Sequence, residues 1–171
     1  MKGLRTANVS VLAESAIDAL DLGGLGRFLG LTQNDEVNVL GAMHFAEVFG
    51  RANVYKLPSP PQREQDATPK HLTSRNLFAD SATYDTLRAR LDTGSVVKLT
   101  KLTDEFDYDA FQEQYGGTAI PLFLSQNNKL TIVATDETAR PGPGQTLIAL
   151  VHPTSNNGED AESTNPSTGE A

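Results

Sequence analysis

LGLTQNDEVNVLGAMHFAEVFGRANVYKL, residues 29–57, contains the clearest pattern of secondary structure in this chain of 171 residues. In its middle part, apolar residues recur at spacings of three and four from Val37 to Val48, as they do along one face of a helix. Thr32-Gln33-Asn34-Asp35 supplies side-chain oxygens that can cap the start of a helix, and Gly50 lies where a glycine in the left-handed conformation would end it. The stretch therefore predicts one long helix from Val37 to Phe49.

Short apolar runs lie on both sides of this helix. The runs from Arg27 to Leu31 and from Asn53 to Leu57 are typical of strands that are buried in a covered sheet. A third run, from Asn8 to Ala13, is expected to be a strand of the same kind, and a weaker helical pattern follows it from Ser15 to Leu25. Because strands and helices alternate, this part of the chain predicts a parallel sheet with crossover helices.

The composition changes at residues 58–73, which are rich in Pro and charge and show no apolar periodicity. Such a segment is typical of a linker. After it, the patterns predict short helices at residues 82–91 and 108–115. The β-prone segments in this half are expected to form an antiparallel sheet. They are residues 96–102, 120–134 with a polar turn at 126–129, and 146–151, and residues 76–78 are expected to be a further strand.

We therefore expect four parts in the chain. Residues 1–57 are predicted to form a partial α/β domain, and residues 58–73 a linker. Residues 74–152 are predicted to form a small α+β domain. Residues 153–171 lack large apolar side chains after Pro153, so they cannot offset the entropy of ordering and are expected to be a disordered acidic tail.

The composition argues against several classes of function. The chain has a formal net charge of −8 at pH 7 and no cluster of Lys and Arg that would bind a nucleic-acid backbone. It has no Cys, which removes disulfides and thiolate chemistry. The longest apolar run, Ala119 to Leu124, is far shorter than the roughly 20 residues of a membrane span, and no signal peptide is recognised. We expect a soluble cytoplasmic protein with no nucleic-acid partner and no direct membrane insertion.

Residues 29–57 resemble the later part of the Rossmann-type domain that regulates potassium conductance and related cation transport in bacteria. The stretches SVVKLTKLTDEFDYDAFQEQYGGTAIPLFL, residues 95–124, and PGPGQTLIALV, residues 141–151, are similar to the domain that follows it in the cytosolic tails of cation:proton (sodium/hydrogen) antiporters. The resemblance extends from Asn8 to Val151. It implies an α/β fold with a partial Rossmann-like parallel sheet, truncated at its N-terminal half, followed by a small α+β domain with an antiparallel sheet.

The resemblance implies a regulatory domain of, or associated with, a monovalent cation:proton antiporter, which transmits a cytosolic signal to transport and is not an enzyme. It places the chain at the cytoplasmic face of the inner membrane, beside a membrane antiporter domain that lies outside this chain. It also implies a homo-oligomer, a homodimer through the long helix, if that helix exposes an apolar face. Two alternatives stay open: an interaction module that binds no small molecule, and a nucleotide-dependent enzyme whose cofactor loop has diverged.

Thr32, Asn34, Asp35 and Glu36 are the candidate nucleotide-binding residues. They follow the predicted strand at residues 27–31, and open α/β sheets bind ligands at the carboxyl ends of their strands. Asp35 and Glu36 lie at the helix N-terminus, where their charge would disfavour a phosphate. A contact with the ribose or base of an adenine nucleotide is therefore one interpretation, and helix capping alone is the other.

No other motif predicts chemistry. Gly24-Leu25-Gly26 follows a predicted helix and precedes a predicted strand, whereas a phosphate-binding G-x-G-x-x-G loop follows a strand and precedes a helix. In the resembling family, the phosphate-binding loop lies in an earlier β-α-β unit, and this chain is expected to begin after that unit. The acidic run from Asp104 to Asp109 lacks the Gly and Glu positions of an EF-hand. His44, His71 and His152 have no metal-site spacing, so neither a metal ligand nor a catalytic residue is predicted.

Overall fold

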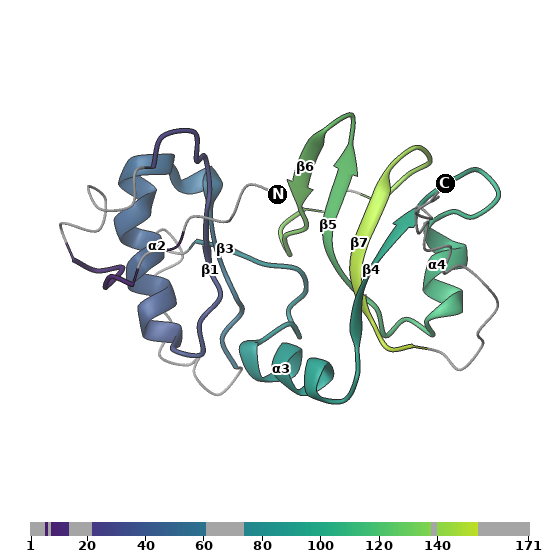
Figure 1. The fold of residues 1–171 in the computed structure, drawn as a ribbon, viewed down its shortest axis with the longest axis horizontal. Helices are drawn as coiled ribbons and strands as arrows, with labels where there is room; N and C mark the ends of the chain where they lie inside the picture. The colour runs from purple at the N-terminus through teal and green to yellow at the C-terminus, as the bar shows by residue number, and fades with distance from the viewer. Residues whose placement is uncertain (1–5, 7, 14–21, 61–73, 138–139, 154–171) are drawn as a thin grey trace, which may run out of the picture.

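The computed structural model describes residues 6, 8–13, 22–60, 74–137 and 140–153. These residues form two β-sheets, a three-stranded sheet and a four-stranded sheet. Figure 1 shows the three-stranded sheet with the long helix α2 at one end of the molecule and the four-stranded sheet at the other. The first sheet is parallel and the second antiparallel, which confirms the α/β fold class predicted from the sequence.

The parallel sheet contains β1 (Phe28–Gly30), β2 (Val54–Lys56) and β3 (Arg75–Asn76), in that order. Helix α2 (Asp35–Phe49) and one turn of 3₁₀ helix (Arg51–Asn53) connect β1 to β2. The predicted helix and its two flanking strands are therefore present.

Helix α2 begins and ends where the sequence predicts. The Asn34 side chain accepts a hydrogen bond from the Val37 N–H, and the Gly50 N–H donates to the Ala46 carbonyl. Gly50 has φ of 76° and ψ of 149°. This conformation is accessible to glycine, but its ψ places it outside the left-handed helical region that a simple C-cap adopts.

Helix α2 packs closely on β1. The rings of Phe28 and Phe45 stack with their centroids 4.9 Å apart, and a Cβ at Gly41 would come within 3.0 Å of the Phe28 ring. The absence of a side chain at Gly41 therefore lets the helix approach the sheet at this point.

The antiparallel sheet has the order β4-β7-β5-β6. Its turn between β5 and β6 carries Asn127 and Asn128 with φ of 50° and 62°, as the sequence predicts for a tight hairpin. Helix α4 covers one face of the sheet and buries Phe111 completely. The elements of this half are α3 (Tyr84–Asp92), β4 (Val96–Lys101), α4 (Tyr108–Gln114), β5 (Ile120–Gln126), β6 (Lys129–Ile132) and β7 (Thr146–Val151).

A single hydrophobic cluster includes residues of both sheets. Tyr55 from β2 and Leu57 after it belong to the same cluster as Ile120 of β5 and Leu150 of β7. Strand β3, which follows the predicted linker, pairs with β2, and Leu77 next to it forms an isolated antiparallel bridge with Ala134. The predicted boundary at residues 58–73 stays a prediction, but the two sheets share a core.

The predicted strand from Asn8 to Ala13 is wrong. These residues form a turn in which the Ala13 N–H donates to the Ser10 carbonyl at 3.0 Å, and Val9 and Leu12 are exposed. The Ser10 hydroxyl also accepts from the Leu12 N–H at 3.4 Å. Serine stabilises such local turns in place of a strand, and none of the described strands pairs with this run.

Several predictions fall outside the described residues. They concern most of the weak helix at residues 15–25, most of the linker at 58–73 and nearly all of the tail at 153–171. Among the described helices, none is long and apolar enough to cross a membrane.

Candidate functional site

The carboxyl end of β1 is attached to α2 by a compact hydrogen-bond cluster between Thr32 and Asn38. The Asn38 Oδ1 accepts from the Thr32 N–H at 3.0 Å and from the Thr32 hydroxyl at 2.7 Å, while the Asn38 Nδ2 donates to the Thr32 carbonyl at 2.8 Å. Asn38 is only 1% exposed. A Cβ at Gly30 would lie 3.2 Å from the Asn38 Cβ, so glycine at position 30 makes room for this buried amide.

The candidate residues Thr32, Asn34, Asp35 and Glu36 lie together at this end of the sheet. The Asn34 Oδ1 accepts from the Val37 N–H at 3.1 Å, and the Asn34 carbonyl accepts from the Thr32 hydroxyl at 3.2 Å. Asp35 and Glu36 occupy the first turn of α2. The geometry shows the capping role of Asn34, and nucleotide binding by these four residues stays a prediction.

Sequence reasoning did not identify Asn38 as part of this site. Its position, four residues after Asn34, places a polar side chain among buried positions of α2 such as Gly41, Ala42 and Phe45. A polar residue on the apolar face of a helix is the one signal in the sequence that indicates a buried hydrogen-bond partner.

Helix α2 carries three exposed apolar side chains among the described residues. Leu40, Met43 and Val48 lie on the helix and are all exposed among the described residues. Oligomerisation through this helix stays a prediction.

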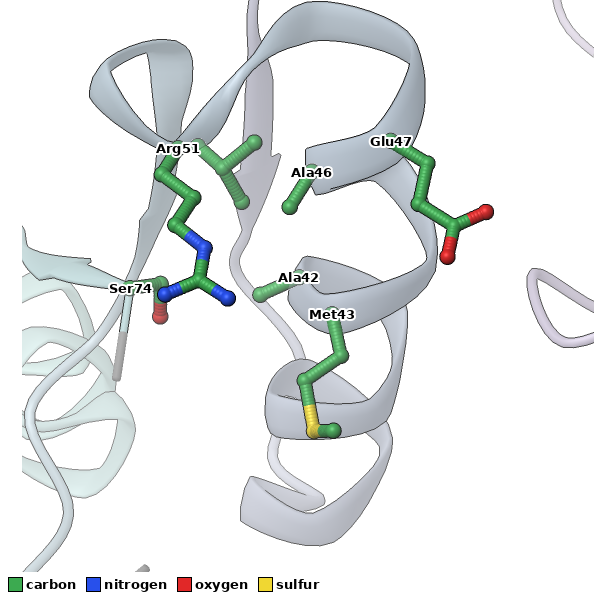
Figure 2. A pocket seen from close by; sticks show the side chains of 7 residues that line it. Ala42, Met43, Ala46, Glu47, Arg51 and Ser74 are labelled. Atoms are coloured by element: carbon green, nitrogen blue, oxygen red, sulfur yellow. The ribbon is translucent and has the colours of Figure 1, made fainter. Parts of the chain in front are cut away.

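A hollow of about 290 Å³ lies between the second half of α2 and the beginnings of β2 and β3. Figure 2 shows Ala42 and Ala46 along one side, with Arg51 reaching across toward Ser74 and Glu47 pointing away. The Ser74 hydroxyl oxygen is buried and has no hydrogen-bond partner among the described residues. Because the strands are parallel, this hollow lies at the opposite end of the sheet from Thr32 and does not extend the candidate site.

Arg75 of β3 is the centre of an ion-pair network that links the two sheets. Its guanidinium donates to both carboxylate oxygens of Asp136, to Glu137 and, at 2.9 Å, to the Tyr55 hydroxyl. It also lies 5.0 Å from the centre of the Tyr55 ring. Asp136 and Glu137 follow β6, so the network joins the parallel sheet to a loop of the antiparallel sheet. Arg27 adds a second link by donating to the Leu130 carbonyl at 2.9 Å.

The hydrogen bonds from Arg75 hold the pKa of Asp136 below its ordinary value, against a smaller opposing effect of burial. Because the pKa of Asp136 is lower in the folded state than in the unfolded state, its ionised carboxylate stabilises the fold at pH values above the unfolded-state pKa, which is about 4. This stabilisation is lost as the pH falls through the folded-state pKa. The unfolding free energy of the wild type should therefore decrease on acidification, and in Arg75→Gln this decrease should be smaller. The difference between the two decreases should be less than about 1 kcal/mol, because Asp136 is largely exposed.

The matched control is Arg88→Gln. The Arg88–Asp92 pair is exposed on α3 and joins residues of one helix only. Urea unfolding between about pH 2 and 7 should give the same profile for this variant and the wild type. Equal acid profiles for Arg75→Gln and the wild type would contradict the role of Arg75.

These features define the class of the protein as an α/β protein with two sheets that share a hydrophobic core. A capped helix begins at the carboxyl end of the first described parallel strand. Within the described residues, no group of His, Cys, Asp and Glu is placed to hold a metal ion. No protein-family model matches the chain, and no curated protein is significantly similar to it.

Among solved structures, the chain is similar to the crystal structure of the GsuK RCK domain. The match covers 88% of this chain and 36% of that chain, with 8% sequence identity and a TM-score of 0.33. The chain thus spans about a third of the length of that structure. At this identity and score, the similarity supports no inference about function.

Proposed function

We propose that this chain is a regulatory module of, or associated with, a monovalent cation:proton antiporter and transmits a cytosolic signal to transport. The hydrophobic cluster shared by the two sheets, which includes Tyr55 on one side and Leu150 on the other, supports the part of this proposal in which the two halves of the chain act as one unit. The proposal also draws on the order and spacing of the stretches at residues 29–57, 95–124 and 141–151. The membrane antiporter domain lies outside this chain, and the module acts at the cytoplasmic face of the inner membrane.

A signal at the candidate site would have a short path to the second sheet. Thr32 is bonded to Asn38 of α2, and α2 packs against β1 and β2. Strand β2 contributes Tyr55 both to the shared cluster and to the Arg75 network. A ligand that favours one arrangement of the Thr32 loop would therefore bias the position of the antiparallel sheet.

The proposed signal is an adenine nucleotide that contacts the candidate residues Thr32, Asn34, Asp35 and Glu36 through its ribose or base. Thermal unfolding with AMP, ADP, ATP, NAD or NADH tests this, because a ligand at 100 times its dissociation constant stabilises a protein by about 2.7 kcal/mol. We expect one nucleotide to raise the unfolding temperature, and Asn34→Ala to lose that rise along with about 1 kcal/mol of helix capping.

Thr83→Ala is the matched control for this experiment. The Thr83 hydroxyl caps α3 by accepting from the Thr86 N–H at 3.2 Å, so its loss costs a similar cap far along the chain from Asn34. This variant should keep the nucleotide response. No response to any nucleotide in the wild-type chain would contradict the ligand proposal and favour an interaction module that binds no small molecule.

Transport measurements test the coupling itself. In proteoliposomes with the complete antiporter, we expect Arg75→Gln to leave nucleotide affinity unchanged but to reduce the effect of the nucleotide on cation:proton exchange, because the ion-pair link between the sheets is lost. Arg88→Gln should respond like the wild type. A response that survives Arg75→Gln unchanged would show that the signal does not pass through this network.

The third interpretation, a diverged nucleotide-dependent enzyme, makes a different prediction. It requires turnover of a nicotinamide cofactor with some substrate, whereas the regulatory proposal requires binding alone. Constant absorbance of NADH across a panel of substrates, together with a thermal shift, would separate the two. A homodimer through α2 remains part of the regulatory proposal, with Leu40 and Met43 at the expected contact.

A further inference from the structure

Strand β4 is an edge strand of the antiparallel sheet, and its outer side has no partner among the described strands. All but one of its residues are exposed. Val96, Val97 and Leu99 are 47%, 54% and 65% exposed. Natural proteins usually protect such an edge with charge, Pro or a covering segment, so an open apolar edge indicates a surface that pairs with another strand.

The hydrogen-bond pattern shows which backbone groups are available. The Leu102 N–H donates to the Gln145 carbonyl, and the Leu102 carbonyl accepts from the Gly144 N–H, so both groups of Leu102 face toward β7. Backbone groups alternate in direction along an antiparallel strand. Residues 96, 98 and 100 therefore also face β7, while the N–H and C=O groups of residues 97, 99 and 101 point outward.

Lysine on an edge strand usually prevents pairing, but the two lysines of β4 do not block this edge. Lys98 extends over the Tyr115 ring, with its Nζ 5.8 Å from the ring centre, on the face covered by α4. Lys101 is at the end of the strand. The central outward-facing residue is Leu99.

We propose that β4 pairs with β4 of a second copy of this chain, antiparallel and across a two-fold axis at Leu99. In this register Leu99 lies opposite its own symmetry mate, Val97 lies opposite Lys101, and Lys98 lies opposite Thr100. No lysine faces a lysine, and the apolar stem of Lys101 covers Val97. The three outward-facing residues of each copy form hydrogen-bonded pairs, which makes one continuous sheet of the two four-stranded sheets.

The occupant is a second copy because the edge is complementary to itself. A two-fold register at Leu99 uses the whole of β4, places no lysine directly opposite a lysine, and sets the exposed side chains of Val97 and Leu99 at the centre of the contact. The interface lies on a different element from α2 and does not depend on the regulatory role.

Cysteine cross-linking tests the register directly, since the chain contains no Cys. Facing Cα atoms in a hydrogen-bonded antiparallel pair are about 5.5 Å apart, within the range that a disulfide spans. Under mild oxidation we expect Leu99→Cys to form a covalent dimer and Val97→Cys to form none, because residue 97 is four strand positions, roughly 13 Å, from its own mate. Dimer from Val97→Cys but not from Leu99→Cys would overturn the register, and dimer from neither would overturn the pairing.

Amide hydrogen exchange of the wild-type chain provides an independent test with its own internal control. We compare exchange at a free protomer concentration ten times the dissociation constant of the dimer with exchange far below that constant. The amides of Val97, Leu99 and Lys101 should exchange about tenfold more slowly at the higher concentration. The amides of Lys98 and Thr100 face β7 and should be protected at both concentrations. Rapid exchange at 97, 99 and 101 up to millimolar protein would refute self-pairing and leave the edge for a strand of another protein.

Leu99→Glu should abolish the concentration-dependent protection, because it places two carboxylates face to face at the axis. Leu91→Glu is the matched control: Leu91 is also an exposed leucine, 51% exposed on α3, and its replacement should leave protection at β4 unchanged. Circular dichroism checks that both variants are folded. Unchanged protection in folded Leu99→Glu would overturn the proposal.

Discussion

Asn38→Ala is expected to reduce the unfolding free energy by about 3 kcal/mol. The replacement removes three hydrogen bonds to Thr32, each with a net value of about 1 kcal/mol, and leaves a small cavity next to Gly30. Because Asn38 is almost completely buried, water cannot fully replace the lost amide. Urea unfolding, monitored by circular dichroism, measures the loss.

Thr32→Val is the control for this variant. It removes the Thr32 hydroxyl, which donates to Asn38 Oδ1 at 2.7 Å, but keeps the two bonds of the Thr32 backbone. It should therefore cost only about 1 kcal/mol. If Asn38→Ala were as stable as Thr32→Val, the two backbone bonds of Thr32 would have no role in holding the Thr32 loop against α2.

The elements of the fold were largely predictable because they depend on local signals. Helix α2 is defined by its apolar spacing, the Asn34 cap and Gly50, all of which lie within a few residues of the atoms they act on. The same is true of the Asp107 cap of α4 and of the Asn127-Asn128 turn, where the side-chain type determines the backbone conformation.

The contacts that organise the two halves were not predictable from local patterns. Arg75 and Asp136 are 61 positions apart, and nothing in either neighbourhood indicates the other. The short strand β3 forms because β2 supplies a partner for it. Residues 8–13 do not form a strand because none of the described strands pairs with them. Of the candidate site, a capping stretch at residues 32–35 followed from sequence, whereas the choice of Asn34 within it and the role of Asn38 required the three-dimensional approach of β1 to α2.

Strand β7 connects the two hydrophobic clusters found among the described residues, because its side chains alternate between the faces of the antiparallel sheet. Leu147, Ala149 and Val151 belong to the cluster beneath α4 that contains Phe111. Leu150 points to the opposite face and belongs to the cluster shared with Tyr55. A cavity on the α4 face should therefore weaken the contact between the sheets as well, although Phe111 itself lies in the second half alone.

Phe111→Ala is accordingly expected to reduce the unfolding free energy by about 4 kcal/mol, in one cooperative transition of both sheets. Hydrogen exchange should show that the amides of β2 lose as much protection as those of β7. Phe111→Leu keeps most of the buried volume and should cost less than about 2 kcal/mol. If β2 kept its protection while β7 lost it, the sheets would unfold independently, the boundary predicted at residues 58–73 would divide two autonomous domains, and the shared core could not carry a signal between them.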